Sequence, residues 1–197
     1  ERMTAIIQSS SQATGVEFDK MTDYMIAATK TLKGTAHEAA ATAGVLNRML
    51  GQERGAESLE WIQEYSVQFR KLGLDLEAAA AVAINSRALG IYQDKAFDAF
   101  KEFGLKINDL STSEEKVLRD ANLFKYFEQL RKGSVPVSEA LSKIGADVKK
   151  LSDEGKDITP VIKAMFGAAG EDMGAAAVKL FEMTKLTGSL KESYLSL

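Results

Sequence analysis

Apolar side chains recur every three or four positions along most of this chain. The spacing is clearest over Phe18–Leu32, Ile62–Leu72, Val137–Leu151 and Met173–Met183. Such spacing places the apolar residues along one face of an α-helix and leaves the opposite face polar. No segment shows the sustained alternation, bounded by hairpin turns, that is typical of strands. The pattern therefore predicts an all-α protein.

Glycines and capping residues divide this pattern into separate helices. Ser111 and Glu114 have the spacing of a capping box, and Thr159 before Pro160 marks a further helix start. A glycine in the left-handed conformation can end a helix, and one follows a periodic run at Gly34, Gly51, Gly73, Gly90, Gly104 and Gly133. The predicted helices, eight to nine in number, lie near 17–33, 35–50, 57–72, 75–89, 93–103, 113–132, 136–151, 159–167 and 171–187. We expect antiparallel helical hairpins, packed as a bundle or as an open array, because the spacing suits shallow crossing angles.

Loop signals suggest how these helices are grouped. They are densest at Gly133–Pro136 and at Ser152–Lys156. We expect a larger helical-hairpin region over 15–110 and a smaller C-terminal helical region over 111–197, with the boundary between 111 and 135. Residues 1–14, rich in Ser, Thr and Gln, are expected to be a flexible segment or a frayed helix. The start at Glu1, without an initiator methionine or a signal segment, favours an excised fragment over a short protein that was trimmed.

Composition narrows the range of functions. The 197 residues include 25 basic and 28 acidic side chains, a formal charge of −3, and no cysteine. This balance predicts neither a nucleic-acid partner nor attraction to anionic lipid. Without cysteine there is no disulfide, no thiolate metal site and no thiol nucleophile. The longest apolar run, 78–84, is far shorter than the roughly 20 residues of a membrane span.

Candidate catalytic and metal-binding groups are sparse. The single histidine, His37, is expected in the first turn of a helix, with no second histidine to share a metal. Three pairs of adjacent acids are expected at or just before helix starts, where the helix dipole favours carboxylates: Glu114–Glu115, Asp153–Glu154 and Glu171–Asp172. Residues 153–157 lack the alternating ligands and the terminal glutamate of a calcium loop.

The glycine-rich segment 166–174 is similarly unlike a phosphate-binding loop. It follows no predicted strand and precedes no Gly-Lys-Ser/Thr, and two of its acids would repel a phosphate. We therefore predict no catalytic, cofactor-binding or metal-binding residues, no cofactor and no enzymatic activity. A small helical enzyme whose site escapes a motif search is disfavoured by the single histidine.

Two apolar clusters have both a core and a binding interpretation. Phe18, Met21, Tyr24 and Met25 are expected in a helical core, and the alternative is a groove for an amphipathic partner helix. Trp61, Tyr65 and Phe69 follow one another at a spacing of four and are likewise expected to anchor a core. The groove interpretation would make the chain a helical adaptor.

The order of several short motifs resembles the family of phage tail tape measure proteins. Residues 60–75 resemble one segment of that family, and 95–109 continue it with the pattern A-x-x-x-F-K-E-F-x-I/L before an Asp/Ser-rich turn. Residues 158–161 and 165–174 resemble the family's turn L/M-F-G-x-x-x-E-D-L-G, and 18–21 after Gly15 its recurrent hairpin opening. The resemblance spans residues 15–186 and is strongest in 56–110 and 157–181.

The resemblance implies a structural virion protein. Members of the family set tail length as extended helical assemblies inside the tail tube, whose subunits polymerise around them with help from assembly chaperones. For this chain it implies contacts with tail tube, assembly chaperone and copies of itself. It also implies a location in the virion tail after assembly and in the bacterial host cytoplasm during synthesis.

The chain departs from the pattern of the whole family protein. It has no long heptad array, and it lacks the hydrophobic segments and the cell-wall-cleaving domain that some members carry. As one continuous helix it would reach only about 300 Å. We therefore expect a folded module of a phage or prophage tape measure protein, with a non-phage helical adaptor as the alternative.

Overall fold

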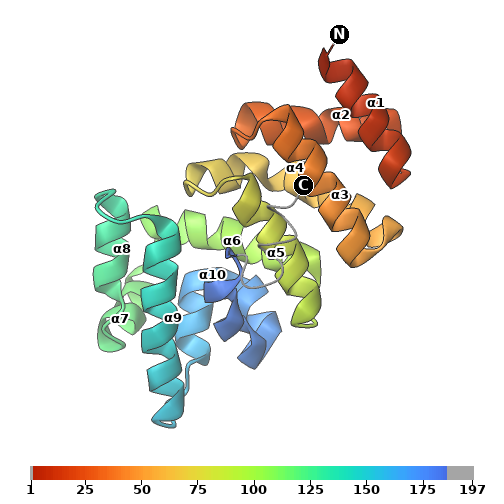
Figure 1. The fold of residues 1–197 in the computed structure, drawn as a ribbon. Helices are drawn as coiled ribbons and strands as arrows, with labels where there is room; N and C mark the ends of the chain where they lie inside the picture. The colour runs from red at the N-terminus through yellow and green to blue at the C-terminus, as the bar shows by residue number, and fades with distance from the viewer. Residues whose placement is uncertain (1, 186–197) are drawn as a thin grey trace. The chain divides into compact units, whose positions relative to one another are not determined.

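The computed structural model describes residues 2–185 and confirms the all-α prediction. These residues contain no strand, and 81% of them are helical. The α-helices are α1 (Arg2–Thr14), α2 (Phe18–Ile26), α3 (Ala36–Leu50), α4 (Gln52–Lys71), α5 (Leu76–Ala88), α6 (Gln93–Asn108), α7 (Thr112–Asp120), α8 (Phe124–Arg131), α9 (Val137–Asp153) and α10 (Thr159–Met173) (Figure 1). A π-helical segment, η1 (Ala27–Thr31), continues α2, and a 3-10 helix, η2 (Gly174–Glu182), follows α10.

Contacts between helices divide the chain into two compact units. Among the described residues, unit 1 comprises 2–93 and 184–185, and unit 2 comprises 94–183. The expected boundary between 111 and 135 instead lies inside unit 2. Its strongest loop signal, Gly133–Pro136, marks the turn between α8 and α9, and these two helices pack against each other.

Unit 1 is built around a close helical hairpin. Gly51 joins α3 to α4, and a Cβ added at Gly55 of α4 would lie 2.8 Å from Cα of Asn47 on α3. The missing side chain thus lets the two helices approach closely. Arg87 of α5 donates a hydrogen bond of 2.6 Å to the carbonyl oxygen of Leu50, which satisfies one of the free carbonyls at the end of α3.

Residues 2–14 form the ordered helix α1 rather than a flexible segment. Ile7, Ser10 and Thr14 are buried, and α1 contacts α2 and α3. The Thr14 hydroxyl donates to the carbonyl oxygen of Ser10 at 2.7 Å, so this polar side chain is satisfied inside the unit. Ser and Thr have only moderate helix propensity and do not mark an apolar face. The sequence therefore did not decide between a flexible segment and a helix here.

Unit 2 is built around aromatic side chains. The ring centroid of Phe103 lies 5.6 Å from that of Phe127 and 5.5 Å from that of Phe166, and Phe166 lies 5.3 Å from Phe181. These rings come from α6, α8, α10 and η2, and all are fully buried. Burial of such large side chains supplies much of the favourable free energy of folding.

Several helices begin or end at the glycines and capping residues that the sequence predicted. The glycines at 51, 73, 90 and 133 have positive φ, and Ser111 and Glu114 form the expected capping box. At the end of η1 the positive φ belongs to Lys33 rather than to Gly34. The helix that starts at Thr159 places Pro160 one position later than predicted.

Three helix predictions were wrong. Helix α6 continues through Gly104 to Asn108, because Phe103 and Ile107 share a buried face that extends past the glycine. The predicted helix 113–132 is two helices, separated near Asn122, which has a φ of 58°. The predicted helix 171–187 is the end of α10 followed by η2, and its last two residues lie outside the described part.

Candidate functional site

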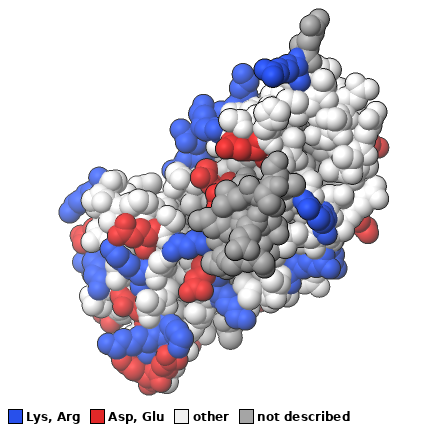
Figure 2. All heavy atoms as spheres, viewed as in Figure 1, with Lys and Arg blue, Asp and Glu red and all other residues white. Residues whose placement is uncertain are grey.

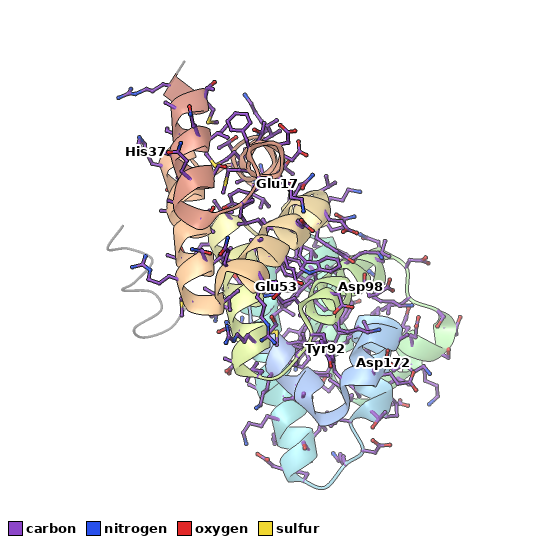
Figure 3. The ribbon with its side chains drawn as sticks, turned by 90° about the vertical axis from the view of Figure 1, so that its right-hand side faces the viewer. Glu17, His37, Glu53, Tyr92, Asp98 and Asp172 are labelled. Atoms are coloured by element: carbon purple, nitrogen blue, oxygen red, sulfur yellow. The ribbon has the colours of Figure 1, made fainter. Side chains whose placement is uncertain are left out.

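His37 lies where the sequence predicted it, exposed in the first turn of α3, and it projects away from the helix (Figure 3). The neighbouring carboxylate of Glu38 is engaged in a capping box. It accepts a hydrogen bond of 2.7 Å from the backbone N–H of Thr35, and the Thr35 hydroxyl accepts one of 3.1 Å from Glu38 N–H. Among residues 2–185, no group of three or more His, Cys, Asp or Glu side chains is placed to hold a metal ion.

Glu114 and Glu115 lie in the first turn of α7, as predicted. Burial by itself would raise the pKa of Glu114, but hydrogen bonds from Lys106 and Ser111 lower it below the ordinary value. Lys106 Nζ lies 2.7 Å from the carboxylate, and both side chains are about four-fifths buried. The pair therefore ties the end of α6 to the start of α7.

The other two acidic pairs lie at helix ends rather than at helix starts. Asp153 is the last residue of α9, and Glu154 follows it. Carboxylates at this end oppose the helix dipole, and each is compensated by a lysine. Lys149 lies 2.7 Å from Asp153, and Lys156 lies 2.9 Å from Glu154.

Glu171 and Asp172 lie in the last turn of α10, beyond the kink at Gly167, where the helix predicted over 159–167 ends. Lys163 lies 2.8 Å from Glu171, and Lys95 lies 3.3 Å from Asp172. In Figure 3, Asp172 and Asp98 of unit 2 come from different helices and do not point at a common place. The glycine-rich segment is thus part of a helical turn whose carboxylates are paired with lysines.

One partly buried polar contact has no signal in the sequence. The Tyr126 hydroxyl on α8 donates a hydrogen bond of 2.8 Å to Asp147 on α9. Burial, together with this carboxylate, raises the pKa of Tyr126 to about 12. The phenol therefore stays protonated near neutral pH and joins two helices, which is a structural task.

Three of the four methionine and aromatic residues of α2 belong to the core, as predicted, but the prediction was wrong for Phe18. Met21, Tyr24 and Met25 are fully buried, whereas Phe18 is 43% exposed. The Tyr24 hydroxyl donates to the carbonyl oxygen of Ala39 at 3.0 Å. Because the methionines have no exposed surface, they offer no open groove to a partner helix.

The three aromatic residues of α4 also anchor the core. Tyr65 and Phe69 are buried, and Trp61 is half-buried with its ring centroid 6.1 Å from that of Tyr65. This arrangement matches the core interpretation of their spacing.

The surface of unit 1 carries an extended region without charge. Residues 3–16 and 39–47 contain no charged side chain, and the helices that bear them, α1 and α3, pack side by side. Figure 2 shows few charged atoms over α1 and α3. We call this surface the uncharged face. Such a face can enter a protein contact without the cost of removing water from charged groups.

The surface of unit 2, unlike the uncharged face of unit 1, carries many charged side chains. Over α7, α8 and α9, Figure 2 shows acidic and basic side chains interspersed. Several of them pair along a single helix at a spacing of four, including Lys116 with Asp120 and Lys143 with Glu139. Interspersed charges of this kind favour contact with water.

Among the described residues, no helix combines the length and the apolar character that crossing a membrane requires.

Comparison with known proteins identifies the class of this chain. A family model described as phage-related minor tail protein matches residues 2–186, which is nearly the whole sequence. Neither the curated proteins nor the solved structures yielded a match. The matched range includes both units and every motif discussed above. The chain therefore belongs to the family of phage-related minor tail proteins.

Proposed function

We propose that this chain is a folded module of a phage or prophage tail tape measure protein and acts through protein contacts, without catalysis. The observation that carries the proposal is the match of the minor tail protein family over residues 2–186. Within that family, the tape measure role is supported by the motifs at 95–109 and 165–174, which resemble those of tape measure proteins.

In the structure, the motif at 95–109 contributes to the packing of α6. Ala96, Phe100 and Phe103 of this motif are fully buried on α6, and Lys101 and Glu102 between them are half-buried. Leu105, its last apolar position, is 56% exposed. The motif therefore builds the core of unit 2. This supports a role in forming a stable helical module rather than a chemical site.

The uncharged face is the proposed contact surface of unit 1. Its exposed side chains on α1 include Gln8, Ser9 and Gln12, which can form hydrogen bonds to a partner without leaving a buried charge. The partners we propose are the tail tube, an assembly chaperone or copies of the same chain. The module would be synthesised in the host cytoplasm and incorporated into the virion tail.

Deletion of the module in the parent phage or prophage tests the role in length determination. An in-frame deletion of residues 15–185 removes up to about 260 Å of helix at 1.5 Å per residue. We expect electron micrographs of negatively stained tails to show shorter tubes than those of the parent. Tails of unchanged length would contradict a contribution to the measure, and absence of the chain from purified tails by mass spectrometry would contradict a virion location.

Substitutions on α1 test the contact surface separately. Gln8→Lys with Gln12→Lys places two charges on the uncharged face, and we expect less of the chain to be recovered with purified tails. Gln63→Lys, an equally exposed glutamine of α4, is the matched control. Equal recovery of both variants, with unchanged circular dichroism, would exclude this face as a contact surface.

A further inference from the structure

Two glycines in the C-terminal part of unit 2 adopt the same rare backbone conformation. Gly167 has φ 58° and ψ −150°, and Gly174 has φ 52° and ψ −131°. This region of backbone space is essentially restricted to glycine. The two residues divide 159–182 into three helical pieces: the first part of α10, its last turns, and η2.

The apolar pattern of the sequence continues through both glycines without a change of register. The apolar residues are spaced by four, three, four, four and three positions: Ile162, Phe166, Ala169, Met173, Ala177 and Leu180. This spacing would place all six on one face of a single straight α-helix. In addition, η2 has nine residues, whereas 3-10 helices longer than three or four residues are uncommon.

Two contacts span the bends of the segment. Lys163 and Glu171 form an ion pair of 2.8 Å across Gly167, although eight residues of α-helix would separate them by about 12 Å along the axis. The rings of Phe166 and Phe181 lie 5.3 Å apart across both glycines, whereas fifteen residues of α-helix span about 22 Å. The Lys163–Glu171 ion pair stabilises the bend at the surface, and the contact between Phe166 and Phe181 stabilises it in the core.

We propose that residues 159–182 form a jointed helix with two states: the bent state of the structure, and a straight α-helix about 36 Å long. Burial of Phe166 against Phe103 and Phe181 favours the bent state. The unbroken apolar register and the poorer hydrogen-bond geometry of a long 3-10 helix favour the straight state, whereas the low helix propensity of glycine opposes it. Straightening separates Phe166 from Phe181 and opens the aromatic core of unit 2. This inference is independent of the proposed phage role.

The chain is well suited to a distance measurement because it contains no cysteine. Thr159→Cys with Lys179→Cys introduces two spin labels at exposed positions, one at each end of the segment. In the straight state the labelled residues lie about 30 Å apart along the helix. In the bent state η2 packs back on α10, so the separation is shorter. Pulsed electron paramagnetic resonance on the full chain should show a main short distance and a minor one near 30 Å.

Replacing both hinge glycines should reverse these populations. Gly167→Ala with Gly174→Ala disfavours the bent backbone, so we expect the distance near 30 Å to become the main one, with helical circular dichroism retained. The control, Gly133→Ala with Gly155→Ala, also strains positive-φ positions and has open space for each added Cβ. It should leave the distance between 159 and 179 unchanged.

A milder variant tests the surface contact without touching the core. Lys163→Ala removes the ion pair across Gly167, and we expect the population near 30 Å to rise about two- to fivefold, as suits an exposed pair. Lys149→Ala, the control, removes a pair that a straight helix also allows. The proposal is overturned if the double glycine variant keeps the short distance, or if its distances broaden with loss of helical signal, whatever the result for Lys163→Ala.

Discussion

Units 1 and 2 reach a helical fold by different physical means. In unit 1, α3 and α4 meet through Gly55 and the backbone near Asn47, and residues 3–16 and 39–47 carry no charge. In unit 2, large aromatic rings from four elements fill the core, and ion pairs cover the helices. Many ion pairs lie in unit 2, and Lys20–Glu60 is an example in unit 1. Close backbone approach thus organises one unit, and bulky side chains organise the other.

The comparison matters for function because the two surfaces have different tendencies. A charged, ion-paired surface is costly to desolvate. An uncharged surface pays a smaller desolvation free energy when it enters a protein contact. This difference is why the proposed contact surface lies on unit 1 and the proposed jointed helix, which depends on an aromatic core, lies in unit 2.

The largest expected effect comes from removing an aromatic ring of unit 2. Phe103→Ala, or Phe100→Ala, should lower the free energy of unfolding by about 3–5 kcal/mol, because a fully buried ring leaves a cavity. Urea denaturation followed by circular dichroism measures the change. Phe18→Ala, at an exposed position of unit 1, should cost less than about 1 kcal/mol. A loss below about 1 kcal/mol for Phe103→Ala would show that the rings do not hold unit 2 together.

An intermediate effect should come from filling the close approach in unit 1. Gly55→Ala places a methyl group 2.8 Å from Asn47 Cα, and overpacking outweighs the gain in helix propensity by about 1–2 kcal/mol. Gly44→Ala, on α3 with open space around its added Cβ, should instead stabilise by about 0.5–1 kcal/mol. Trp61, the only tryptophan, lies on α4 and reports unfolding of unit 1 by its fluorescence. Shifts of the same sign in both variants would disprove the close-packing account.

A smaller effect distinguishes the two capping boxes. Glu38 of unit 1 serves its cap alone, whereas Glu114 of unit 2 also binds Lys106, so Glu114→Gln should cost more than Glu38→Gln, by about 1 kcal/mol. Because the folded-state pKa of Glu114 lies below its ordinary value, its contribution is present above the unfolded pKa of about 4.5.

This contribution is lost as the pH falls through the lower folded pKa, so Glu114→Gln should flatten the decline in stability below about pH 4.5. Urea midpoints measured between pH 3 and pH 7 provide the readout. Parallel curves for Glu114→Gln and the parent chain would rule out this carboxylate as a source of acid sensitivity.

The smallest effect should come from the surface ion pairs, despite their number in unit 2. Lys149→Ala breaks the pair with Asp153, and we expect a change below about 0.5 kcal/mol, since exposed pairs at a spacing of four contribute little. The urea midpoint should also change little in 1 M NaCl. A loss above about 1 kcal/mol would mean that unit 2 depends on charge as well as on its aromatic core.

Prediction from the sequence worked best where one short-range cause decides the structure. The capping box at Ser111 and Glu114 was confirmed because both partners lie within one turn of each other. The buried stripe of Met21, Tyr24 and Met25 was confirmed because helical periodicity determines which residues share a face. His37 was predicted in a first turn, and it lies there.

The errors share a different cause. Gly104 did not end α6, because burial of Phe103 and Ile107 extends the helix past it. Asp153 and Glu171 were assigned to positions at or just before helix starts. Asp153 instead ends α9, which runs past its predicted end, and Glu171 lies in the last turn of α10, between the breaks at Gly167 and Gly174. The contact of Tyr126 with Asp147 joins residues 21 positions apart, and no local pattern marks it.

By itself the sequence determined that this chain is helical, where most of its helices begin, and which residues face a core, because these depend on interactions within a few turns. Only the tertiary structure decided how the chain divides into two units and that Gly55 lets two helices meet. The break at Gly167 agrees with the predicted helix end there, but only the structure showed the second break, at Gly174, in a segment whose apolar register is that of a straight helix. The physical reason is that these features depend on side chains distant in sequence, such as Phe103, Phe166 and Phe181, whose mutual burial outweighs local preference.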